Sequence, residues 1–192
     1  FVRGNHESCF RAGQGWQRFI SPFIWESNKS CNLVANDDLA DYSAPYTVPI
    51  AKNAQFIIFD SSKSPNKLID DKNKMYEIYK HQFAQVDNLS KKSKLNLFLS
   101  HHPFYGVLEE LGKNSSIKVQ SGLNSILKAE YPDKLMPNRV SATIHGHIHL
   151  FESLVYIEPH PPTFIIGNSG SAMDSSLPID INENKSLMKS LG

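Results

Sequence analysis

The sequence of 192 residues contains little cysteine, no long apolar run and no surplus of either charge. Its two cysteines, Cys9 and Cys31, are too few for a disulfide scaffold or a four-cysteine zinc site, and they could form one bridge or two reduced thiols. The longest apolar runs, such as residues 56–59, are far shorter than the roughly 20 residues that cross a bilayer. The sequence therefore predicts no membrane segment.

The balance of charge excludes a further class of protein. Lysine and arginine number 20, aspartate and glutamate number 19, and the formal net charge is +1. A protein that binds nucleic acid or an anionic membrane carries a basic surplus on one face. With 40% hydrophobic and 20% charged residues, the composition is typical of a soluble globular chain. We therefore expect one domain over residues 1–192, with no nucleic-acid-binding surface.

The first residues indicate that part of the domain lies upstream. Residue 1 is Phe, and residues 1–3 have the pattern of a strand end that runs into a polar turn. Nothing before Gly4 has the basic and apolar regions of a signal peptide. We expect that the beginning of the domain, with any targeting signal, precedes Phe1, so the compartment stays open. The cysteine pair is compatible with an exported protein without requiring one.

Short apolar runs bounded by turn residues predict strands, because they are rich in β-branched and aromatic side chains. These runs cover residues 46–50, 55–59, 95–99, 140–144, 151–157 and 164–166. A helical period of apolar residues predicts a helix over 75–86, with Asp70 and Asp71 available as caps. Weaker helical patterns occupy 121–131 and 10–19, and two glycines interrupt the second of these. The predicted fold class is therefore α/β.

Three polar clusters each follow a predicted strand. They are Gly4-Asn5-His6-Glu7, Ser100-His101-His102-Pro103 and His145-Gly146-His147-Ile148-His149. Ligands of α/β proteins bind at the carboxyl ends of strands, so the three clusters are expected to converge. Imidazole nitrogen is the commonest metal ligand in proteins, and an amide oxygen such as that of Asn5 suits a harder cation. Two ions about 3.5–4 Å apart would suit displacement at phosphorus.

In this order, Gly4-Asn5-His6-Glu7, His101-His102-Pro103 and Gly146-His147-Ile148-His149 resemble motifs of the calcineurin-like metallophosphoesterases, purple acid phosphatases included. The three motifs extend over residues 4–149. The Asp-x-His and Gly-Asp motifs that precede them in that family are absent, which agrees with a missing upstream portion. The serine/threonine phosphatases of the same superfamily share the first motif but lack Gly-His-x-His. The purple acid phosphatase-like branch is therefore the favoured one.

The resemblance implies a role for each matched residue. The implied metal ligands are Asn5, His101 and His147 for one ion and His149 for the other. His6 would contact the phosphate or protonate the leaving oxygen as general acid. His102 would lie beside the metal without binding it, and His145 would be a packed or solvated histidine. The two divalent or trivalent ions would be iron, zinc or manganese.

The resemblance also implies a four-layer α/β/β/α sandwich, of which this chain would be the C-terminal portion. The implied reaction is hydrolysis of a phosphate monoester, in a small phosphorylated substrate, by a hydroxide held by two metal ions. Phosphodiester or nucleotide hydrolysis and a catalytically silent binding domain of the same fold are the alternatives. Because the remaining metal ligands would lie upstream, we expect that residues 1–192 alone do not turn over substrate.

Overall fold

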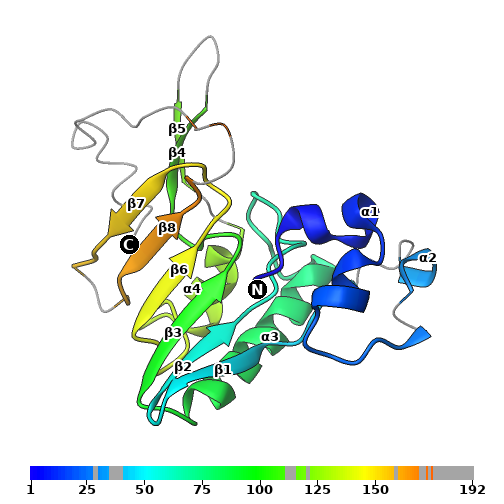
Figure 1. The fold of residues 1–192 in the computed structure, drawn as a ribbon. Helices are drawn as coiled ribbons and strands as arrows, with labels where there is room; N and C mark the ends of the chain where they lie inside the picture. Colours follow the sequence, from blue (N-terminus) through cyan, green and yellow to red (C-terminus); the bar gives the residue numbers. More distant parts are fainter. Residues whose placement is uncertain are drawn as a thin grey trace.

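The computed structural model describes residues 1–27, 30–34, 41–110, 116–119, 122–157, 160–168, 172 and 174. A six-stranded sheet in the order β1-β2-β3-β6-β8-β7 forms its centre, and β4 and β5 form a two-stranded sheet that projects beyond it (Figure 1). The strands are β1 Tyr46–Ala51, β2 Ala54–Ile58, β3 Leu95–Ser100, β4 Val107–Glu110, β5 Ser116–Val119, β6 Ala142–His145, β7 Phe151–Leu154 and β8 Thr163–Ile166. The helices are η1 Asn5–Glu7, α1 Cys9–Ala12, η2 Trp16–Ile20, α2 Cys31–Val34, α3 Lys74–Ser90 and α4 Asn124–Glu130. The predicted α/β fold class is confirmed.

The four central strands of the large sheet run parallel. β2 pairs with β3, β3 with β6 and β6 with β8 in parallel, while β1 and β7 pair antiparallel at the two edges. Parallel neighbours end at the same edge of a sheet. The segments that follow β3 and β6 therefore leave the sheet side by side, and these segments carry two of the three histidine-bearing clusters.

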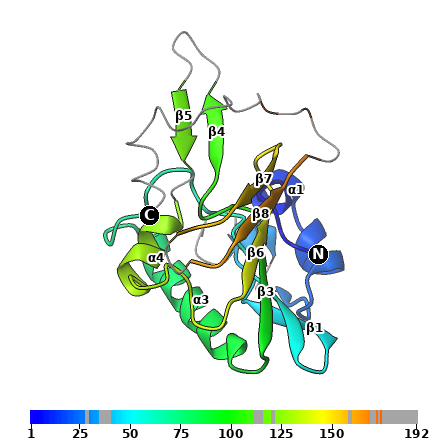
Figure 2. The ribbon, with the colours of Figure 1, turned by 90° about the vertical axis from the view of Figure 1, so that its left-hand side faces the viewer.

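α3 and α4 lie together on one face of the sheet (Figure 2). Phe59, which follows β2, packs on Phe83 of α3 with 4.8 Å between ring centroids and on Phe98 of β3 at 5.4 Å. All three rings are fully buried. Burial of each such side chain stabilises the fold by roughly 1.5–3 kcal/mol, so this aromatic contact fixes β2 and β3 beneath α3. Among the helices described, none has the length and apolar character needed to cross a membrane.

The predicted strands and the two longer helices are confirmed, with ends that differ by a few residues. α3 begins at Lys74 because the side chain of Asn73 caps it and accepts the Met75 amide at 3.0 Å. The expected caps, Asp70 and Asp71, lie upstream of this cap. The broken pattern over 10–19 forms two short helices, α1 and the π-helix η2, separated at Gly13, whose φ is 57°.

The structure differs from the sequence-based prediction in two further places. Residues 1–3 pair with no strand of the described chain, although Gly4 is extended with φ −98° and ψ 175°. An extended segment becomes a strand only when a neighbour accepts its main-chain hydrogen bonds. β4 and β5 were not predicted, and they pair antiparallel from Val107↔Val119 to Glu110↔Ser116. Their sequences, Val-Leu-Glu-Glu and Ser-Ile-Lys-Val, contain no apolar run longer than two residues.

A disulfide joins Cys9 of α1 to Cys31 of α2. This bond answers the question that the sequence left open between one bridge and two thiols. The cysteines are 22 positions apart, so the bond restricts the unfolded chain over the whole segment between them. The N-terminal segment, which has little core of its own, is thereby held together.

Arg3 is buried where the N-terminal segment meets the sheet. Its guanidinium forms ion pairs with Asp41 and with Asp60, the second at 3.0 Å, and donates to the Glu7 carbonyl at 3.1 and 3.2 Å. Asp60 follows β2 and also accepts the Ser43 amide at 2.8 Å. Lys63 Nζ lies 3.5 Å from Asp41, so two cations face two buried carboxylates. The contacts of Arg3 therefore fasten the loop over residues 4–7 to the end of β2 without leaving an uncompensated charge.

Arg3→Met is expected to lower the free energy of unfolding by about 3–5 kcal/mol, because it removes the cation that pairs with buried Asp60 and leaves buried Asp41 with Lys63 alone, at 3.5 Å. Urea unfolding with the disulfide intact measures this loss. The matched control is Lys91→Met, which removes an exposed ion pair to Asp87 at 2.8 Å and should cost about 0.3–0.5 kcal/mol. Equal, small losses in both variants would contradict a structural role for the buried cluster.

Glu152 of β7 is a buried carboxyl whose Oε2 accepts the Val107 amide at 3.0 Å. Burial raises its pKa from the ordinary 4.5 to about 7, opposed by that hydrogen bond. The folded protein therefore retains this proton over a pH range in which the unfolded chain has lost it. The resulting stabilisation is fully present below pH 4.5 and is lost as the pH rises through about 7.

Glu152→Gln is expected to gain stability relative to the native protein as the pH rises, because glutamine carries no charge to bury. Between pH 4 and pH 8 the difference in the free energy of unfolding should grow by up to about 3 kcal/mol. Urea unfolding of both proteins across this range measures it, with Glu77→Gln on the exposed side of α3 as control. A difference that does not vary with pH would show that Glu152 titrates normally.

Candidate metal centre

The candidate centre is built at the ends of β3 and β6. Ser100 of β3 pairs with His145 of β6 in parallel register, so His101 and Gly146 follow at the same edge. The Gly146 amide donates to the His101 carbonyl at 3.0 Å and continues the contact beyond the last pair of strands. His147 adopts a φ of 70°, a left-handed conformation that few residues other than glycine adopt. Its ring centroid lies 5.0 Å from that of His101.

Asn5 reaches the same place from the N-terminal loop. His101 Nε2 lies 3.0 Å from Asn5 Oδ1 and 3.2 Å from His147 Nδ1. Three atoms that can each offer a lone pair face one another, and a single N–H proton on His101 can be shared between the two neighbours. A cation in place of that proton would satisfy all three atoms. Imidazole nitrogen and amide oxygen are suitable donors for transition-metal ions, so these residues fit the metal that the resemblance implies.

Gly4 allows the N-terminal loop to approach His101 closely. A Cβ at Gly4 would lie 3.1 Å from His101 Nδ1 and 2.8 Å from Glu7 Oε2. Both distances are shorter than ordinary contacts, so a side chain here would push the loop away from the ring. Glu7 Oε2 also accepts the Gly4 amide at 3.0 Å. The absence of a side chain at Gly4, together with the hydrogen bond from its amide to the Glu7 carboxylate, therefore lets the loop bring Asn5 against His101.

Burial keeps the imidazoles of the centre neutral. Desolvation, followed by the charge of His147, lowers the pKa of His101 to about 4 and that of His102 to about 2. Burial also lowers the pKa of His147, reinforced by the charge of His149 and opposed by Asp174. Metal ions bind the neutral form of imidazole. The rings are therefore in the protonation state that a ligand needs at neutral pH.

His6 and His149 lie near this group. The charge of either residue lowers the pKa of His101, after the larger effects of burial and His147. The side chain of His6 is exposed, whereas His149 is half-buried and its amide donates to Asp174 Oδ2 at 2.8 Å. The structure thus brings all five predicted site residues to one edge of the sheet. The three in direct contact are Asn5, His101 and His147.

Two further histidines are buried beside the centre. His145 Nδ1 lies 2.8 Å from Ser100 Oγ, and its buried ring is packed within the fold, one of the two environments expected for it. The ring centroid of His102 is 4.1 Å from that of His147. One potential ligand atom from each of His101, His102 and His147 lies within 4.8 Å of the others. His102 is therefore part of the cluster and not merely beside it.

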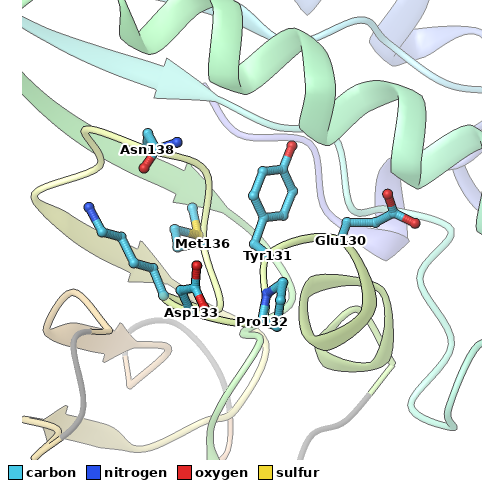
Figure 3. A pocket seen from close by; sticks show the side chains of 7 residues that line it. Glu130, Tyr131, Pro132, Asp133, Met136 and Asn138 are labelled. Carbon is cyan, nitrogen blue, oxygen red and sulfur yellow. The ribbon is translucent and has the colours of Figure 1, made fainter.

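A pocket of about 220 Å³ opens beside His101 and Gly146. A second pocket, of about 330 Å³, follows α4 and is lined by Tyr131 and Met136 among others (Figure 3). None of the predicted site residues lines the second pocket. Of these two, only the pocket at His101 adjoins the candidate centre, and its lining is largely apolar, with Val2, Leu99, Ile144 and Ile166.

The residues that hold the centre in place were missed in the sequence. Arg3 joins Asp41 and Asp60 across 38 and 57 positions, and no local pattern marks a pairing over such distances. Asp174, whose carboxylate binds the His149 amide, was missed for the same reason. A buried ion cluster becomes visible only once the fold brings its members together.

Comparison with known proteins agrees with the motifs and the fold. Residues 1–151 match the family model of the calcineurin-like phosphoesterases. No curated protein matches the sequence. The matched span includes every candidate ligand from Asn5 to His149 and five of the six strands of the main sheet in whole or part. The chain therefore belongs to the calcineurin-like phosphoesterase family, whose chemistry is metal-dependent hydrolysis of phosphoesters.

Proposed function

We propose that the protein hydrolyses phosphate monoesters with two metal ions. The observation that carries the proposal is the contact between Asn5, His101 and His147, three residues from distant parts of the sequence whose lone pairs face one another. These residues would hold one ion and His149 the other. Imidazole nitrogen suits iron and zinc, whereas manganese, the third candidate ion, has the stronger preference for oxygen ligands. The motif resemblance to purple acid phosphatases favours a monoester over a diester.

The chain holds the donors in position before any ligand arrives. The hydrogen bond between the Gly146 amide and the His101 carbonyl, together with the close approach of Gly4, fixes the His101 side of the centre. When bound, the metal ions supply a hydroxide nucleophile at neutral pH and offset charge on the phosphoryl oxygens. A small phosphorylated substrate would approach the exposed side of the centre, where His6 lies. Fixed donors need little reorganisation during the reaction.

His6 is the proposed general acid. It follows Asn5 directly, and its side chain is exposed next to the centre. An exposed imidazole can take a proton from water and donate it to the oxygen of the leaving group. Arg3 holds the same loop through the Glu7 carbonyl, at 3.1 and 3.2 Å. His6 would thus be positioned by the buried ion cluster while remaining open to solvent.

A catalytically silent domain of this fold is the alternative that a specific observation favours. In the part of the chain that is described, the group of ligand atoms within 4.8 Å consists of histidines and contains no carboxylate. A dinuclear centre usually needs a carboxylate to bridge its ions. For the same reason we propose that residues 1–192 alone do not turn over substrate, and the tests below use the full-length natural protein.

His147→Ala is expected to lower phosphatase activity and bound metal together, by at least about 100-fold in activity, because it removes a donor of the centre. The assay uses p-nitrophenyl phosphate with added manganese, zinc or iron, and metal content is measured by mass spectrometry. His81→Ala, on the exposed side of α3, serves as control and should leave both unchanged. Bis(p-nitrophenyl) phosphate in parallel separates diesterase from monoesterase activity. Full activity in the His147 variant would contradict the assignment of His147 as a metal ligand. Metal binding by the native protein without phosphatase activity would support the catalytically silent domain.

His6→Ala is expected to slow the reaction most for substrates with poor leaving groups, because an alkoxide needs a proton more than nitrophenolate does. General acid catalysis typically contributes about 10²–10⁴-fold. We expect a loss in this range for an alkyl phosphate and a clearly smaller one for p-nitrophenyl phosphate, with metal content unchanged. Equal losses for the two substrates would mean that His6 binds phosphate and does not transfer the proton.

A further inference from the structure

We propose that His102 is a metal ligand in this protein and adds a third imidazole to His101 and His147. The inference rests on the proposed metal-dependent function. It departs from the role that the motif resemblance implies, in which His101 alone of the two adjacent histidines binds metal. Three features of His102 support this role: the position of its ring, an unpaired ring nitrogen and the hydrogen bonds that hold its main chain.

The three imidazoles converge. The ring centroid of His102 lies 4.1 Å from that of His147 and 5.0 Å from that of His101, and one potential ligand atom from each ring lies within 4.8 Å of the others. Zinc binds imidazole nitrogen at about 2.0–2.1 Å with tetrahedral geometry, so two nitrogens on one ion lie roughly 3.4 Å apart. The contact of 3.2 Å between His101 Nε2 and His147 Nδ1 already has this spacing, and the widest pair of the three would have to close by about 1.4 Å at most.

His102 has an unsatisfied polar atom. The side chain is 4% exposed, and its buried Nδ1 has no hydrogen-bond partner in the described part of the chain. His145 and His160 also have one buried ring nitrogen each, Nε2, without a partner, but neither ring belongs to the group of three converging imidazoles. Buried polar atoms in native proteins are almost always paired, and an orphan at a cluster of imidazoles points to a ligand that completes it. Among the rings of the cluster, His101 and His147 are already in contact through Nε2 and Nδ1.

The main chain of His102 is fixed on both sides of its Cα. Its amide donates to Ser61 Oγ at 2.8 Å, and its carbonyl accepts from Ser100 Oγ at 2.8 Å. Ser61 directly follows Asp60, which pairs with Arg3. Because these hydrogen bonds fix the main chain at His102, only the side-chain torsions remain to be ordered when the ring binds an ion. A metal site needs ligands whose positions are fixed in this way.

A third imidazole has a consequence for the choice of metal. Imidazole suits zinc, iron and copper, whereas magnesium and manganese prefer oxygen ligands. With Asn5 as the single oxygen donor in contact with His101, this half of the centre would select zinc or iron over magnesium. Replacement of His102 by a side chain without a donor should therefore weaken zinc more than magnesium.

The first experiment is a competition titration of zinc against a chromophoric chelator, with native full-length protein, His102→Phe and His160→Phe. His160 is the matched control, because it is also a buried histidine but lies in a different cluster, with its ring 4.6 Å from that of Tyr105. We expect His102→Phe to weaken the affinity for zinc by at least about 100-fold, which exceeds the usual effect of removing a residue that only orients a ligand. His160→Phe should leave the affinity for zinc unchanged. A smaller loss in His102→Phe would overturn the inference.

The second experiment remains decisive even if His102→Phe does not fold. His102→Cys places a thiol at the same position, and cobalt is added to one equivalent. A thiolate bound to cobalt gives a charge-transfer band in the near ultraviolet that neither the native protein nor His160→Cys should show. Absence of the band in folded His102→Cys would overturn the inference.

These outcomes separate the two proposals. If the native protein binds no zinc or cobalt, the proposed function and the role of His102 fail together. If it binds metal and hydrolyses phosphate monoesters but the His102 variants behave as their controls, only the role of His102 fails. If the His102 variants lose zinc as expected and the native protein has no phosphoesterase activity, the metal site stands and the proposed function fails.

Discussion

The position of the candidate centre depends on the buried pairing of Arg3 with Asp41 and Asp60. A guanidinium away from water is tolerated only when carboxylates and carbonyl oxygens compensate it, and here the Glu7 carbonyl completes the set. Because Arg3 contacts both the Glu7 carbonyl and Asp60, the loop over residues 4–7 cannot move away from β2 without leaving a buried charge unpaired. An otherwise polar, solvent-facing turn is thereby fixed at the edge of the sheet, where Asn5 meets His101.

The second constraint comes from the parallel pairing of β3 and β6. Their register places His101 and Gly146 side by side, and the hydrogen bond between them leaves little choice of path for the next residue. As a result, His147 adopts a φ of 70°, a backbone conformation that is unfavourable for residues other than glycine. The contact of its Nδ1 with His101 shows what the conformation achieves, and a bound cation would stabilise it further. The left-handed conformation at this point is thus linked to the contact between the two rings.

The order of the motifs and the strands before two of them could be predicted from the sequence, because apolar runs and short motifs are local patterns. The cap at Asn73 was misplaced by a few positions for want of any packing information. The strands β4 and β5 contain no apolar run longer than two residues, so the sequence does not mark them. For Cys9 and Cys31 the sequence is as compatible with two reduced thiols as with the disulfide that the structure contains. The role of Arg3 could not be predicted at all, since its partners are 38 and 57 positions away. Contacts between residues that are far apart in the sequence leave no local pattern, so they could not be predicted.

The charge of the whole chain, +1, says little about the centre. Asn5, His101 and His147 are neutral donors, since burial lowers the pKa values of the two imidazoles. Neutral donors leave the charge of a bound cation uncompensated, so a complete dinuclear centre would still need a carboxylate between its ions. In the described part of the chain the imidazole cluster contains no carboxylate. The buried carboxylates of Asp41 and Asp60 are paired with Arg3 and Lys63 at a separate place, where they hold the loop over residues 4–7.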